Sequence, residues 1–151
     1  MRGGNCLASL NSKIKMISAR NKMKGEVINV NKGAVNGIVK VKFGSNTVSA
    51  TISLEAIKEL GITEGKQVTA IAKATDVMVG VGEIKEISAR NIFKGEVVKI
   101  NEGAVNSIVN IKVEDTLFSA TISKEAAEEL KLTEGKEASV IIKATSVMIM
   151  A

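Results

Sequence analysis

The sequence has no histidine, proline, tryptophan or tyrosine, and only one cysteine and three phenylalanines among 151 residues. Histidine and cysteine are the usual protein ligands of zinc, copper and related cations, so we expect no site for such a cation. Catalysis by a histidine base or a histidine-containing triad is excluded within the chain. Cys6 has no second cysteine with which to form an internal disulfide. This fits a reducing compartment and predicts a cytoplasmic protein.

Long apolar segments are also missing from the sequence. The apolar runs are only a few residues long, so no segment has the length of a membrane-spanning helix. Residues 1–15 carry Arg2, Lys13 and Lys15 but lack the apolar stretch of a signal peptide. We therefore expect residues 1–15 to form a disordered leader and the protein to have no membrane partner.

A shift of 70 residues aligns the sequence with itself without a gap. Residues 17–78 match residues 87–148, with 36 identities in 62 positions. The blocks ISARN, KGEV, GAVN, SATIS, TEGK and KAT-x-VM each occur twice at that spacing. Such self-similarity indicates a duplicated small domain. We expect a first unit at 16–80, a linker at 81–86 and a second unit at 87–151. Units this small are marginally stable alone, so the two should pack on each other or on further chains.

Each unit has the pattern of short strands with one helix. Apolar and β-branched residues alternate in several segments bounded by glycine-containing turns. Ser53 is placed to cap a short helix whose apolar positions are Leu54, Ile57 and Leu60. Five strands with a helix between the third and fourth predict an all-β protein made of two OB-like five-stranded barrels in tandem, with an SH3-type barrel as the alternative. The predicted strands of the first unit are 27–30, 38–43, 47–52, 68–72 and 77–79.

The net charge of +5 is unevenly distributed. Residues 17–78 carry a net charge of +4, whereas residues 87–148 carry −1. A protein that follows a phosphate backbone is expected to be basic along its whole binding face. The second unit does not meet that expectation.

The polar residues that recur unchanged in both units are mainly hydrogen-bond donors. Each unit repeats one arginine, one lysine and several hydroxyl side chains, without a carboxylate or imidazole in the same motifs. Arginine supplies a planar fork of donors and lysine a point charge, while the segment at Ser53 adds the free N–H groups of a helix start. Each residue alone has an ordinary explanation, such as a helix cap or a solvated charge. Together they predict a site for a compact oxyanion, without distinguishing molybdate from sulfate or phosphate.

The order ISARN, K-G-x-V, TIS, EGK and KAT-x-VM, found in both units, resembles the small molybdate-binding proteins known as molbindins or Mop proteins, which carry TOBE domains. The resemblance implies an OB-like barrel that holds molybdate or tungstate as an intact oxyanion, in intracellular molybdenum storage or homeostasis. It also implies a homotrimer of tandem chains with anion sites between domains.

Two kinds of anion site follow from this resemblance. The first combines the SARN segment, the serine that ends TIS and the KAT segment. The second lies near the three-fold axis, and we assign it to the GAVN segment, for which a tight turn is the other explanation. The first kind comprises Ser18, Ala19, Arg20, Asn21, Ser53, Lys73, Ala74 and Thr75, and in the second unit Ser88, Ala89, Arg90, Asn91, Ser123, Lys143, Ala144 and Thr145; the second kind comprises Val35, Asn36, Val105 and Asn106.

Two other classes of function are alternatives to oxyanion binding. An OB barrel with a pI near 9.4 could bind single-stranded nucleic acid. Such barrels stack bases on aromatic side chains, and this chain has only Phe43, Phe93 and Phe118, of which Phe43 and Phe118 fall on apolar strand positions. An enzyme acting on a pterin or a phosphorylated compound needs a nucleophile and a base, and no such pair is visible. We therefore expect a non-catalytic binding protein without a nucleic-acid partner.

Overall fold

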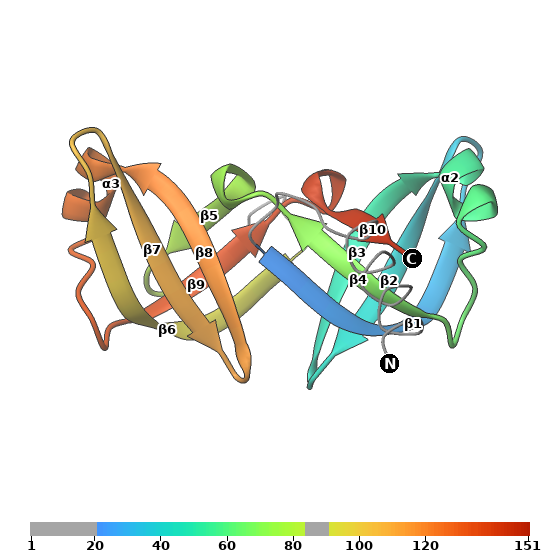
Figure 1. The fold of residues 1–151 in the computed structure, drawn as a ribbon, viewed down its shortest axis with the longest axis horizontal. Coiled ribbons are helices and arrows are strands. Elements are labelled where there is room, and N and C mark those ends of the chain that lie inside the picture. The colour runs from blue at the N-terminus through green and yellow to red at the C-terminus, as the bar shows by residue number, and fades with distance from the viewer. Residues whose placement is uncertain (1–20, 84–90) are drawn as a thin grey trace, which may run out of the picture.

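The structure is a computed structural model, and it describes residues 21–83 and 91–151. Within them, two five-stranded antiparallel sheets lie side by side, each curled into a half-barrel (Figure 1). The short helices α2 and α3 lie at opposite outer ends of the molecule (Figure 1). This architecture confirms the predicted all-β fold with two five-stranded units in tandem.

The two units contain the same elements in the same order. The first unit comprises β1 (Asn21–Lys32), β2 (Asn36–Phe43), β3 (Asn46–Ser53), α2 (Leu54–Glu59), β4 (Gln67–Ala72), the 3-10 turn η1 (Ala74–Asp76) and β5 (Val77–Gly80). The second comprises β6 (Asn91–Glu102), β7 (Asn106–Val113), β8 (Thr116–Ser123), α3 (Lys124–Glu129), β9 (Glu137–Ile142), the 3-10 turn η2 (Ala144–Ser146) and β10 (Met148–Met150).

The helix caps predicted from the sequence are present in both units. The Ser53 hydroxyl oxygen accepts a hydrogen bond from the Ala56 N–H at 3.1 Å, and Ser123 accepts from the Ala126 N–H at 3.0 Å. Each cap satisfies one N–H group that the first helical turn leaves without a partner. Among the described residues, no helix is both long and apolar enough to cross a membrane.

The two units exchange their last strands. β5 follows the first unit but pairs with β9, with Val77 opposite Ile142, and β10 pairs with β4, with Met148 opposite Ile71. The strand orders are therefore β10-β4-β1-β2-β3 and β5-β9-β6-β7-β8. The strand predicted at 77–79 exists, but placing it in its own unit was wrong. The hydrogen bonds between strands join main-chain groups and do not depend on which side chains are present. The edge of β9 can therefore pair with β5 as well as the equivalent edge of β4 could.

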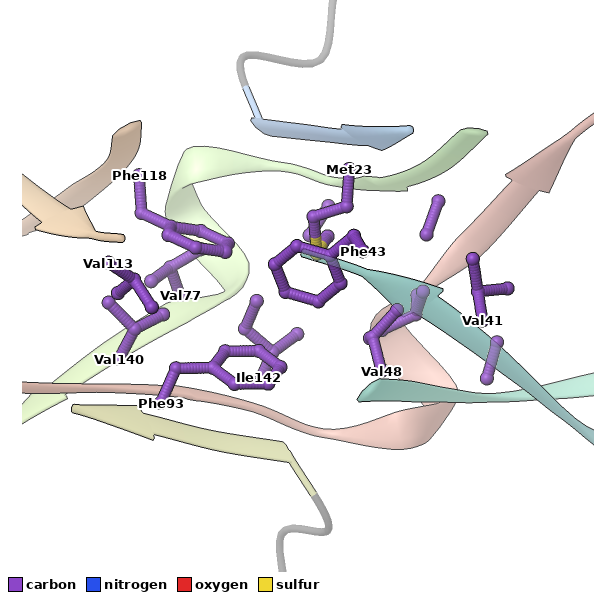
Figure 2. Close-up of a cluster of buried hydrophobic side chains, with 14 of the residues drawn as sticks. Met23, Val41, Phe43, Val48, Val77, Phe93, Val113, Phe118, Val140 and Ile142 are labelled. Atoms are coloured by element: carbon purple, nitrogen blue, oxygen red, sulfur yellow. The ribbon is translucent and has the colours of Figure 1, made fainter. Parts of the chain in front are cut away.

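The three phenylalanines of the chain meet in the core where the two units join. Phe43 contacts Phe93 and Phe118 edge to face, with ring centroids 5.3 and 6.3 Å apart, and Phe93 stacks on Phe118 at 5.8 Å (Figure 2). All three rings are at most 4% exposed. Because these are the only aromatic side chains, none is left on the surface as a platform for bases. Their burial weighs against the nucleic-acid alternative.

A second contact joins the hairpins at Gly44 and Glu114. Glu114 has a φ of 53°, in the left-handed region, where its counterpart Gly44 has 61°. A carboxylate at this position accepts hydrogen bonds from the Ser45 hydroxyl and, at 3.2 Å, from the Ser45 N–H. These two bonds, of which the one from the Ser45 hydroxyl has the larger effect, lower the pKa of the Glu114 carboxyl below its ordinary value. The contact is therefore stronger when Glu114 is ionised.

A carboxyl group with a lowered pKa in the folded state stabilises the fold above its unfolded pKa and loses that contribution as the pH falls through its folded pKa. We therefore expect Glu114→Gln to lower the melting temperature at pH 7, and the difference from wild type to shrink below about pH 4. Differential scanning calorimetry at pH 7 and pH 3.5 measures this, with Glu134→Gln in the turn after α3 as the control. A difference that grows on acidification would contradict the contact.

Candidate functional site

Two asparagines from the SARN motifs join the two units. The Asn21 amide nitrogen donates to the Ser119 carbonyl at 2.9 Å, and its amide oxygen accepts from the Ser119 N–H at 2.7 Å. Asn91 makes the same pair of bonds to the main chain of Ser49, at 2.9 and 2.7 Å. Both asparagines are at most 2% exposed. Their amides thus bridge the two units.

The KAT segments lie at the same junctions. Ala72 pairs with Asn21, and the chain then continues through Lys73 into η1, which packs against β8 of the other unit. The second unit mirrors this arrangement, because Ile142 pairs with Asn91 and η2 packs against β3. The two 3-10 turns are the short coils near the middle of Figure 1. Each KAT segment therefore faces a strand of the opposite unit.

We call these junctions the β8 seam and the β3 seam. The β8 seam consists of Asn21, Lys73 and η1 against Ser119; the β3 seam consists of Asn91, Lys143 and η2 against Ser49. Lys73, Thr75, Lys143 and Thr145 are exposed at the seams, whereas Ala74 and Ala144 are each 7% exposed and anchor the turns. Each seam thus offers an ammonium group and a hydroxyl group to the solvent.

The remaining SARN residues lie outside the described residues. These are Ser18, Ala19, Arg20, Ser88, Ala89 and Arg90. In the sequence, Arg20 directly precedes Asn21 and Lys73 directly follows Ala72, the residue paired with Asn21. In the second unit, Arg90 directly precedes Asn91 in the sequence, and Lys143 directly follows Ile142, the residue paired with Asn91.

Ser53 and Ser123 do not lie beside the lysine of the KAT segment in their own unit. Ser53 pairs with Asn36, and the neighbouring Leu54 N–H donates to the Val35 carbonyl at 3.0 Å. This is the end of the sheet where β1 finishes, whereas Lys73 follows the pair at the start of that 12-residue strand. At about 3.3 Å per residue the two ends are on the order of 35 Å apart along the strand. The serine caps therefore lie with the GAVN hairpins, as Ser123 does with Asn106.

The GAVN hairpins expose an apolar side chain at their tips. Val35 is 72% exposed and Val105 is 73% exposed. Asn36 and Asn106 are exposed beside them. These four residues lie at the outer end of each sheet, away from the seams.

Ser49 and Ser119 belong to the seams but were missed as site residues. Both are half-buried and present their main chain to the bridging asparagines. The sequence does contain a signal for these serines, because SATIS recurs unchanged and its first serine and its threonine alternate with core residues. What the sequence could not show is that each SATIS strand faces the other unit. Within the described residues, no three histidine, cysteine, aspartate or glutamate side chains gather where a cation could bind.

The family comparison matches both halves of the chain. Residues 17–79 and 87–149 each match the TOBE domain. The probable molybdenum-pterin-binding protein of Haemophilus influenzae is 53% identical over 66 residues, which cover 43% of this chain and 96% of that protein. Molybdenum-pterin-binding protein 2 of Clostridium pasteurianum is 45% identical over 64 residues, covering 42% of this chain and 94% of its own length.

A solved structure matches almost the whole chain. The cytoplasmic molybdate-binding protein ModG, in a crystal form with molybdate bound, superposes with a TM-score of 0.87 at 38% sequence identity. The match covers 89% of this chain and 98% of that protein. The duplication, the exchanged strands and these matches agree, and the chain belongs to the TOBE-domain family, with two TOBE domains in tandem.

Proposed function

We propose that this chain binds molybdate, or tungstate, as an intact oxyanion and serves in molybdenum storage or homeostasis in the cytoplasm. The observation that carries the proposal is the match over nearly the whole chain to a protein with molybdate bound. The short relatives named as molybdenum-pterin-binding proteins support it for each unit separately. Holding the anion requires no chemical conversion, and the donor residues of the repeated motifs suit binding alone.

The proposed sites lie at the two seams. The Lys73 ammonium and the Thr75 hydroxyl supply donors at the β8 seam, together with the SARN residues Ser18 and Arg20. Lys143, Thr145, Ser88 and Arg90 do the same at the β3 seam. A tetrahedral dianion has four acceptor oxygens, and charge-assisted hydrogen bonds from guanidinium and ammonium groups are the strong ones. Ala74 and Ala144 fix the turns that carry the donors.

We further propose that the working form is a homotrimer of tandem chains. The exposed Val35 and Val105 at the outer hairpins support contacts between chains, because association would remove these side chains from water. In such an assembly Ser53, Ser123 and the GAVN residues Asn36 and Asn106 would meet neighbouring chains. Sedimentation velocity should then give three times the 15.9 kDa chain mass, and a monomer at micromolar concentration would contradict the assembly.

Calorimetric titration of the purified protein tests the ligand. Molybdate and tungstate should give saturable heat, whereas sulfate and phosphate should compete weakly or not at all. Elemental analysis by mass spectrometry, on protein from cells grown with molybdate, should find molybdenum retained through purification. If no heat accompanies any of the four anions, the proposed function fails.

A further inference from the structure

The two seams of one chain are built alike but are not chemically equivalent. The units are identical at the asparagine and the lysine that define each seam, yet they differ at neighbouring positions, two of which concern the seam serine and the 3-10 turn. Lys40 lies directly across from Ser49 in the β3 seam, and Asn110 takes that place across from Ser119 in the β8 seam. The third residue of the 3-10 turn is Ser146 in η2 and Asp76 in η1.

The cross-strand neighbour decides what the seam serine can offer. Residues directly opposite in an antiparallel pair have Cβ atoms about 4.5–5.5 Å apart. Asn110 uses this proximity, because its amide oxygen accepts a hydrogen bond from the Ser119 hydroxyl at 2.8 Å. The Ser119 proton is therefore engaged. Lys40 has donors and no acceptor, so it does not engage the Ser49 proton and adds an exposed ammonium group beside it.

Both differences make the β3 seam more positive than the β8 seam. Lys40 and Lys143 give the β3 seam two cations, and Ser146 is neutral. The β8 seam has Lys73 as a cation, the neutral Asn110, and the exposed carboxylate of Asp76. Over these three positions the formal charge is +2 in the β3 seam and 0 in the β8 seam, and it is +2 against +1 when the residue after each seam asparagine, Ile92 or the exposed Lys22, is counted as well. A dianion interacts with this difference through twice its unit charge, and the effect extends over about 10 Å at moderate salt.

We propose that the duplicated chain carries two classes of dianion site, a tight one at the β3 seam and a weak one at the β8 seam, set by Lys40 and Ser146 against Asn110 and Asp76. This inference rests on the proposed function, since it assigns unequal affinity to the same seams. Lys40 sets the affinity of the tight site. A chain with both classes retains molybdate when supply is low and takes up more when supply rises.

The test exchanges the differing residues between the seams and measures molybdate binding by calorimetry at low salt. Wild type should show two classes separated by about tenfold or more in Kd. Lys40→Asn with Ser146→Asp should weaken the tight class by about tenfold and leave the weak class unchanged. Asn110→Lys with Asp76→Ser should strengthen the weak class by a similar factor. Raising the salt to 0.5 M should narrow the separation.

Matched controls separate local from overall charge. Lys58→Glu on α2 changes the net charge as the first double variant does, and Glu128→Lys on α3 changes it as the second does; both residues are exposed at the outer ends. Neither control should alter the separation. Lys40→Asn alone is an exposed substitution that keeps the test available if the double variant folds poorly. Saturable wild-type binding with one class, or a separation that Lys40→Asn leaves intact, would overturn this inference while the proposed function stands. If the wild-type protein gave no heat with molybdate, both this inference and the proposed function would fail.

Discussion

Replacing both seam lysines with glutamate, Lys73→Glu with Lys143→Glu, should weaken molybdate binding by at least about 100-fold at every seam site. A hydrogen bond to a charged group contributes about 1.5–3 kcal/mol, and each factor of ten in Kd corresponds to about 1.4 kcal/mol. Glutamate removes the donor and adds a repelling charge. Both lysines are exposed, so the fold should be kept, with the melting temperature changed by little.

The matched control is the pair Lys58→Glu with Lys124→Glu. These lysines are exposed on α2 and α3 at the outer ends, and their replacement changes the net charge by the same amount. The control should bind molybdate nearly as wild type does. Calorimetry of both double variants gives the comparison. If the seam variant binds as tightly as the outer-end control, Lys73 and Lys143 are not ligand-contacting residues. Arg20→Glu extends the same test to the SARN motif.

Local physical chemistry made most of the fold predictable. Alternating apolar residues give the strands, and the hydroxyl of Ser53 caps α2 as the sequence indicated. The exchange of β5 and β10 was not predictable, because β4 and β9 are equivalent edges in two near-identical units. What selects one edge is how the connecting residues cross between the units, and no side-chain pattern within a strand reports that path.

The types of residue in the site were predictable from the sequence, but which of these residues lie together was less predictable. The recurrence of SARN and KAT indicated donors, and the Asn21–Ala72 pairing places the two motifs next to each other. The serine that ends TIS was grouped with them because it recurs too, yet it caps a helix at the other end of the sheet. The sequence also places Asn21 among the anion donors, and the structure shows that its amide bonds to the main chain of Ser119 in the other unit. The residue pattern of a single unit does not indicate which of its residues contact the other unit.

Removing the asparagine bridge should destabilise the whole chain. Asn21→Ala leaves the Ser119 N–H and carbonyl groups without their partner in a half-buried seam, at a cost of about 1–3 kcal/mol for each group. We expect the free energy of unfolding to fall by roughly 2–6 kcal/mol. Asn29→Ala is the control, since Asn29 lies exposed on the same strand and undergoes the same chemical change; it should cost less than about 0.5 kcal/mol.

Urea unfolding of both variants measures the difference, and molybdate titration of Asn21→Ala shows what the bridge does for binding. Asn21 follows Arg20 in the sequence and pairs with Ala72, the residue before Lys73. Its amide holds this pair against β8. Its loss should therefore weaken binding at the β8 seam while the β3 seam, held by Asn91, keeps its affinity. Equal weakening at both seams would show that the bridge acts on the assembly as a whole. A stability loss no larger than that of Asn29→Ala would show that the exchanged strands alone hold the units together.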